Sequence, residues 1–372
     1  MEAAPVRNLH LTARHVHLLR HFSTKEKLDD SLRAIYFKER KRTPMGSTTS
    51  TIEEAARLAR TAIVMGHGGG SDCLVASLVG DWLTRMGVER VILGGVACQW
   101  WLPPGEERVG LKSVLGPDFY EPTDLVGAKP LNDHAVIVGA DASLEGRAPH
   151  EATAARNFGG EAFIISLRGG GQGVGAGMKA VIEHYGADLI VSVDVGSDTL
   201  STGDEIRPTQ TSLADHLTLS GLLQQDIVTY FALAGYGLDA EMELEELDAN
   251  LGTAIRGGSF RGVIGASYPA LEKVRDLHAQ AHDPIGSLVI KAGLGEFGLE
   301  RVVKSNPFGE VARIGPSAVP IWVFDPVMVT RLVAKHAADL IPTTSLANAE
   351  DVYRSLGRVP ETGLLRFIDY AR

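Results

Sequence analysis

The chain has 372 residues, of which 44% are hydrophobic, and a formal net charge of −10 at pH 7. This length suits one large domain or two medium domains with a sizeable core, and the acidic balance argues against non-specific binding to nucleic acid. Two cysteines imply no disulfide framework, and no apolar run reaches the ~20 residues of a membrane span or resembles a signal-peptide h-region. We therefore expect a cytoplasmic protein that binds neither nucleic acid nor membrane.

Residues 1–44 differ in charge from the rest of the chain. They contain ten Lys or Arg and five Asp or Glu, a balance of +5, so residues 45–372 hold −15. A basic segment of this kind could contact an acidic partner or a membrane surface, but terminal segments are more often mobile. We expect a mobile extension, or a translated upstream segment ahead of a start at Met45, followed by one elaborated α/β domain over residues 45–372.

The first strand–turn–helix unit spans residues 61–86. Residues 61–65 form an apolar, β-branched run that predicts a buried parallel strand, and the apolar positions of 73–86 recur at helical spacing. The glycine turn between them would bring backbone N–H groups and a helix N-terminus together, which favours an anion site. A tight turn that only allows close packing is the alternative, because neither G-x-G-x-x-G nor a P-loop is present. The candidate ligand-binding residues are Gly68, Gly69, Gly70 and Asp72.

The remaining elements follow the same alternation. Apolar runs predict strands at 90–93, 134–138, 162–166, 189–193, 227–234, 263–266 and 320–324. Helical spacing predicts helices at 51–60, 175–185, 212–223, 244–256 and 269–282, whereas 287–294 suits a helix or a strand. This order predicts an α/β fold with a doubly wound, mostly parallel Rossmann-like sheet and helices on both faces.

Polar residues follow most of the predicted strands, where a doubly wound sheet binds its ligands. We expect these residues to converge at the carboxyl edge of the sheet. Trp100 and Trp101 follow the second strand and could form the floor of a pocket or be buried beneath the next loop. Residues 102–133 form a long predicted loop that could act as a lid. The polar strand-end residues are His67, Asp72, Asp141, Arg168, Asp194, Asp198 and Asp239.

The acidic residues after the fifth strand are the most distinctive group. Asp194, Asp198, Asp204 and Glu205 place four carboxylates within twelve residues. Crowded carboxylates repel one another and need a cation or bound protons, and their hard oxygens suit Mg²⁺, Ca²⁺ or Mn²⁺. We expect a divalent-metal site at Asp194, Asp198 and Glu205; the alternative is that these loop acids cap turns and face water. Zinc is not indicated, because no H-E-x-x-H or C-x-x-C motif occurs.

Other side chains could take part in the chemistry. Arg168 with Gly169 and Gly170 could grip a phosphate or carboxylate, or Arg168 could form a salt bridge to one of the acids. His67 could act as a general acid or base, or only hydrogen-bond at the strand end. Asp215 lies near the start of the helix after the acidic loop and could hydrogen-bond back into the site.

Three strand-end segments share a pattern: GHGGGSD at 66–72, DVGSDTLSTGDE at 194–205 and AGYGLDAE at 234–241. They resemble the Gly-Gly-Asp and Gly-x-Gly-x-Asp-x-Glu signatures of an uncharacterised prokaryotic family, a domain of unknown function, over roughly residues 55–330. Before Asp198 the chain has one glycine where two are expected, which bears on the tightness of that turn. The resemblance implies a Rossmann-like fold and a strand-end site, and it brings no established activity.

We expect an enzyme that acts on a small anionic or nucleoside-like metabolite by hydrolysis or group transfer. The glycine turns would bind the anion, and Mg²⁺ or another divalent cation is a candidate cofactor. A nucleotide- or dinucleotide-dependent kinase or oxidoreductase is an alternative, although the sequence has no nicotinamide or flavin fingerprint. A non-catalytic ligand-binding protein is another, and a homodimer is a candidate assembly. The candidate catalytic residues are His67, Asp194, Asp198 and Asp239.

Overall fold

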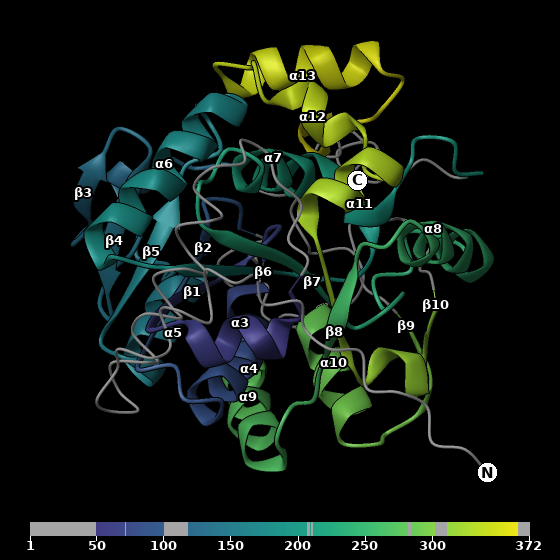
Figure 1. Cartoon of the computed structure of the whole chain (residues 1–372). Helices are drawn as coiled ribbons and strands as arrows, with labels where there is room; N and C mark the ends of the chain where they lie inside the picture. The colour runs from purple at the N-terminus through teal and green to yellow at the C-terminus, as the bar shows by residue number, and fades with distance from the viewer. Residues whose placement is uncertain are drawn as a thin grey trace, which may run out of the picture. The chain divides into compact units, whose positions relative to one another are not determined.

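The computed structural model describes residues 50–70, 72–99, 118–206, 209, 211–281, 284–301 and 311–363. The chain divides into two units, Met1–Pro44 and Met45–Arg372, and everything below concerns the second (Figure 1). The expected mobile extension, Trp100, Trp101 and residues 102–117 of the predicted lid lie outside the described residues.

Within the described residues, nine strands form one sheet, which is the centre of the fold (Figure 1). The strands are β1 Thr61–Gly66, β2 Arg90–Val96, β3 Lys129–Asn132, β4 Ala135–Gly139, β5 Glu161–Ile165, β6 Leu189–Val195, β7 Val228–Ala234, β8 Phe260–Ile264 and β11 Ile321–Phe324. Their order across the sheet is β3-β4-β5-β2-β1-β6-β7-β11-β8. A separate antiparallel pair consists of β9 Gly298–Arg301 and β10 Val311–Ile314.

The centre of the sheet is parallel and its two margins are antiparallel. Strands β5, β2, β1, β6 and β7 run in the same direction, whereas β4 is antiparallel to β5, and β11 is antiparallel to both β7 and β8. The chain builds outward from β1 to β2 and β5, then returns to place β6 on the other side of β1. This order confirms the predicted doubly wound, mostly parallel fold and sets its switch point between β1 and β6.

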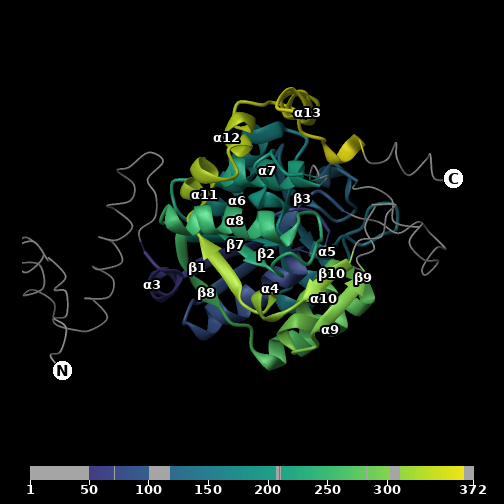
Figure 2. The same ribbon diagram turned by 90° about the vertical axis from the view of Figure 1, so that its right-hand side faces the viewer.

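Helices cover both faces of the sheet, as predicted. They are α3 Ile52–Leu58, α4 Asp72–Arg85, α5 His150–Phe158, α6 Gly170–Tyr185, α7 Ser212–Leu222, α8 Leu244–Arg256, α9 Tyr268–Ala281, α10 Pro284–Gly293, α11 Pro326–Leu332, α12 His336–Leu340 and α13 Leu346–Ser355. Short 3-10 turns occur at η3 Pro122–Asp124, η4 Asp198–Leu200, η5 Pro316–Ala318 and η6 Glu361–Gly363. Both ribbon views show α7, α12 and α13 on one side of the sheet, and α4, α9 and α10 on the other (Figures 1 and 2).

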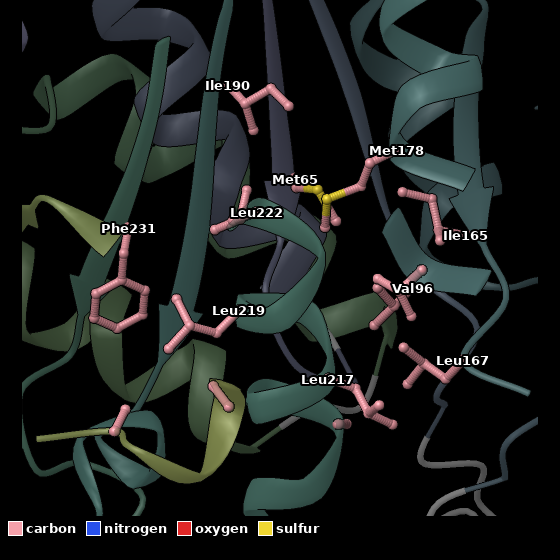
Figure 3. Packing of buried hydrophobic residues seen from close by; sticks show 14 of the residues in the cluster. Met65, Val96, Ile165, Leu167, Met178, Ile190, Leu217, Leu219, Leu222 and Phe231 are labelled. Carbon is pink, nitrogen blue, oxygen red and sulfur yellow. The ribbon is translucent and has the colours of Figure 1, made fainter. Parts of the chain in front are cut away.

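The core between the sheet and α7 holds the base of the site. Every residue of β6 and every residue of α7 is buried, which is expected of a parallel strand covered on both faces and of a helix packed within the fold. Met65 of β1, Val96 of β2, Ile165 of β5 and Leu219 of α7 lie in this layer (Figure 3). A close-packed apolar layer of this kind fixes the strand ends that carry the polar residues.

The element boundaries follow local signals in most places. Thr51 and Glu54 form a capping box at the start of α3, and Gly186 ends α6 with a left-handed φ of 63°. Residues 287–293 of the stretch 287–294 are helical, within α10, and β8 begins at Phe260, ahead of its predicted position. No helix among the described residues is both long enough and apolar enough to span a bilayer.

Candidate functional site

The carboxyl ends of β1 and β6 lie next to each other, because these two parallel strands pair directly. Gly66 of β1 is opposite Val193 of β6, and the N–H of His67 donates to Val193 O at 2.9 Å. The glycine turn after β1 and the acidic segment after β6 therefore face each other at the switch point of the sheet, which is where doubly wound folds bind ligands.

Three carboxylates from three different elements meet at this point. Asp72 begins α4, Asp194 lies in β6 and Asp215 lies in the first turn of α7. One oxygen of each lies within 4.8 Å of the others, and the residues are only 8%, 1% and 4% exposed, respectively. We call this group the Asp72–Asp194–Asp215 cluster.

The glycine turn is shaped around the cluster and its neighbours. A Cβ on Gly68 would lie 2.5 Å from Asp215 Oδ1, and one on Gly69 would lie 2.6 Å from Cys98 Sγ, so neither position has room for a side chain. The N–H of Gly68 donates to Asp72 Oδ2 at 2.9 Å, and that of Gly70 donates to Cys98 O at 3.0 Å. The N–H groups of Gly68 and Gly70 are therefore already bound to oxygens of the protein. The anionic group nearest to the turn is a carboxylate of the cluster.

Burial makes the ionised state of the cluster unfavourable. It raises the pKa of Asp194 and of Asp215 well above the ordinary aspartate range, and the neighbouring charge of Asp198 raises both further. Asp194 Oδ2 has no hydrogen-bond partner among the described residues, whereas Asp215 Oδ1 accepts from Thr199 Oγ1 at 3.4 Å. The three carboxylates cannot all be ionised unless a cation compensates them, and without one at least one of them holds a proton.

Asp198 and Asp239 flank the cluster and make other contacts. Asp198 begins η4 and accepts a 2.8 Å hydrogen bond from Thr211 Oγ1. Asp239 accepts from the backbone N–H of Ser197 at 3.0 Å and from its hydroxyl at 2.9 Å. Gly196 has a φ of 140°, and a Cβ there would lie 2.7 Å from Asp239 Oδ2. Asp239 thus fixes the turn that leads from β6 to Asp198.

His67 is completely buried beside β6. Its Nδ1 lies 2.8 Å from Ser192 Oγ, and Nε2 has no partner with hydrogen-bond geometry among the described residues. Burial lowers the pKa of His67 to about 3, so the imidazole is neutral at physiological pH and lacks the second ring proton that an imidazolium acid would donate.

Two of the expected members lie away from the cluster. Because β4 is antiparallel to β5, Gly139 pairs with Glu161 at the amino end of β5. Asp141, which follows β4, therefore lies at the opposite edge of the sheet, and our expectation that it joins the other strand-end residues is wrong. Glu205 accepts from the N–H of Gly203 at 3.0 Å and pairs with Arg358 Nη1 at 3.3 Å, so it belongs to a different set of contacts.

The second glycine segment is also occupied by the protein itself. Helix α6 begins at Gly170 rather than at 175, so Gly169 is its N-cap and the glycines that follow form its first turn. Thr343 Oγ1 accepts from the N–H of Gly171 at 2.8 Å, and Thr343 O accepts from that of Gln172 at 3.0 Å. These amides are therefore not available to an external anion.

Arg168, next to that segment, is exposed and donates from Nε to Phe119 O at 2.8 Å. This contact orients the guanidinium toward the backbone of a neighbouring loop. Within the described part of the chain, Arg168 does not form the salt bridge to an acid of the site that we considered from the sequence.

A buried polar network that the sequence did not reveal holds α7 in place. Arg358 Nη2 donates to Thr209 Oγ1 at 2.7 Å and to Ser212 Oγ at 2.9 Å, and it also contacts Ser201 Oγ. Glu361 Oε1 accepts from the N–H of Ala214 at 2.9 Å. This network fixes the first turn of α7, from which Asp215 reaches the cluster, and no local pattern marks partners so far apart in the chain.

Comparison with known proteins agrees with the resemblance seen in the three strand-end motifs. Neither the curated proteins nor the solved structures include a match to this chain. A family model described as protein of unknown function (DUF1152) matches residues 63–364. This span includes the three cluster residues and also Arg358 and Glu361. The chain therefore belongs to the DUF1152 family.

Proposed function

We propose that this protein is an enzyme that acts on a small anionic or nucleoside-like metabolite by hydrolysis or group transfer, with the reaction at the Asp72–Asp194–Asp215 cluster. The observation that carries the proposal is the convergence of three buried carboxylates at the switch point of the sheet. Burying like charges together lowers the stability of a fold. Ionisable side chains that are buried together despite this loss of stability, and whose pKa values are shifted, are typical of active sites.

Asp198 and Asp194 are the residues that we propose to orient a water molecule or a substrate hydroxyl for attack. Asp198 lies at the rim of the cluster, held by Thr211, and its charge acts on both Asp194 and Asp215. An anionic group of the substrate would need positive charge beside these acids. Arg168 and Arg358 already bind oxygens of the protein, so we propose Mg²⁺ or another divalent cation for this task.

We propose a cytoplasmic location, because the chain has only two cysteines, Cys73 and Cys98, and neither is in a disulfide. Secreted proteins more often use their cysteines in disulfides. The position of the site at a strand-end crevice supports a small-molecule substrate, since doubly wound folds bind metabolites and cofactors there.

The test is a thermal-shift screen of nucleotides, sugar phosphates and amino acids, with and without Mg²⁺, followed by turnover assays of the ligands found. We expect Asp198→Asn to stay folded, to keep ligand-induced stabilisation and to lose turnover. Asp204→Asn is the matched control, because Asp204 is exposed in the same segment. Full turnover in Asp198→Asn would contradict the proposed role, and a ligand that is bound but never converted would favour a binding protein.

A further inference from the structure

We propose that Asp72, Asp194 and Asp215 bind one divalent cation of the Mg²⁺ and Mn²⁺ class. This ligand set differs from Asp194, Asp198 and Glu205, which the sequence alone indicated. The inference rests on the proposed function, because it assigns the cofactor site of that same centre, but cation binding can be measured without any substrate.

The spacing of the three oxygens fits a common ligand. Oxygens bound to one Mg²⁺ at ~2.1 Å lie about 3 Å apart when adjacent and about 4.2 Å apart when opposite, and the longer bonds of Ca²⁺ widen both values. The cluster oxygens lie within 4.8 Å of one another. Three oxygens this close can reach one ion once the side chains adjust.

The carboxylate of Asp194 has one oxygen that the described part of the chain leaves unsatisfied. Asp194 is only 1% exposed, so water does not reach its carboxylate. Its Oδ2 atom also has no hydrogen-bond partner among the described residues. The ion pairs found among the described residues do not include Asp194 or Asp215. An isolated buried carboxylate oxygen is strongly unfavourable, and a cation at the centre of the cluster would satisfy it.

The donor atoms select the class of cation. All three ligands are carboxylate oxygens, which suit hard cations, whereas structural zinc sites rely on cysteine and histidine. Three protein oxygens leave coordination positions of an octahedral ion for water or for a substrate oxygen. That arrangement is the one that metal-assisted hydrolysis and group transfer require.

Glu205 is the member of the alternative ligand set that other residues already bind most fully. Asp198 Oδ2 accepts from Thr211, and Glu205 is bound by Arg358 and by the backbone of its own turn. Glu205→Gln is therefore a discriminating variant. It would abolish cation binding under the sequence-derived ligand set, whereas the present one predicts that the variant still binds one Mn²⁺ per chain.

The experiment titrates the full chain with Mn²⁺ and follows the EPR signal of the free ion. We expect one Mn²⁺ per chain, and a loss of affinity of about tenfold or more in Asp72→Asn, Asp194→Asn and Asp215→Asn, since even indirect changes at metal sites reach that size. Asp81→Asn is the matched control, because Asp81 is on the same helix as Asp72 but is partly exposed and pairs with Arg85.

A measurement on the unmodified chain keeps the inference testable if a variant does not fold. Mg²⁺ should slow hydrogen exchange at 66–70 and 194–200 in the wild-type protein and should leave β9 and β10 unchanged. Absence of Mn²⁺ binding by the wild type, or unchanged affinity in the three Asn variants, would overturn the cation site. Stoichiometric Mn²⁺ binding without turnover of any screened ligand would count against the enzyme and not against this site.

Discussion

Arg358 Nη1 lies 3.3 Å from Glu205 Oε2, and the two side chains are only 3% and 2% exposed. The other terminal nitrogen of the same guanidinium reaches Ser201 and Ser212. One planar group with several donors in fixed directions therefore ties the segment after β6 to the start of α7.

Arg358→Met should destabilise the fold by about 3–5 kcal/mol, because it leaves the Glu205 carboxylate buried without a cation. Urea unfolding monitored by circular dichroism measures the change. Arg354→Met is the control, since Arg354 is 50% exposed and pairs on the surface with Glu350, and it should cost less than about 1 kcal/mol. Equal losses in the two variants would show that the buried pair does not stabilise the fold.

Gly68→Ala should destabilise the protein by about 1–3 kcal/mol through overpacking. A Cβ at this position would lie 2.5 Å from Asp215 Oδ1 and 2.9 Å from Oδ2, so the carboxylate has to move and Mn²⁺ affinity should fall as well. Gly139→Ala is the control, because a Cβ there meets nothing within 4 Å. Calorimetric unfolding of Gly68→Ala and Gly139→Ala under the same conditions measures the difference in stability. Equal melting temperatures would count against a close contact between residue 68 and the carboxylate of Asp215.

Glu151 should make stability depend on pH. Burial raises the pKa of Glu151 from 4.5 to about 7, and hydrogen bonds from its own N–H and from Cys73 oppose this in part. The folded chain thus holds a proton that the unfolded chain releases. The resulting stabilisation is complete below about pH 4.5 and is lost as the pH rises through about 7, a change of about 3 kcal/mol.

Glu151→Gln removes this contribution and leaves those of the other buried acids in place. The difference in free energy of unfolding between wild type and Glu151→Gln should therefore change by about 2.5 kcal/mol between about pH 5 and about pH 8, in favour of the variant at the higher pH. Urea titrations across that range supply the measurement. Two curves that run parallel would mean that Glu151 titrates in the folded protein as it does in water.

Thr343→Val should cost about 1–2 kcal/mol, because the N–H of Gly171 at the start of α6 loses its acceptor while the shape of the side chain is kept. Thr343→Ser retains the hydroxyl and should retain most of the stability. Thermal unfolding distinguishes the two. If serine and valine behave alike, the hydroxyl does not cap this helix.

The parallel core of the sheet could be predicted because each strand carries its own signal. Apolar runs bounded by glycine marked β1, β2, β5, β6 and β7, and all five are present. The direction of β4 could not be predicted in this way, since an apolar run is the same pattern whichever way the strand points. That ambiguity placed Asp141 at the wrong edge of the sheet.

The site was predictable only where its residues follow a strand directly. Asp72 and Asp194 were found from glycine-rich strand ends, whereas Asp215 was noted with little support, because an aspartate in a first helical turn is usually a cap. The contacts that fill the second glycine segment and hold Glu205 come from residues 172 and 153 positions away in sequence. Sequence patterns describe neighbours along the chain and contain no information about such partners.

The buried network around Arg358 also has a consequence for synthesis of the chain. Arg358 and Glu361 follow every strand of the sheet in sequence, and domains begin to fold while they leave the ribosome. A nascent chain that is shorter than this segment can pair its strands and bring the aspartates near one another. It cannot anchor the first turn of α7, so the geometry of the acidic centre is set late in translation.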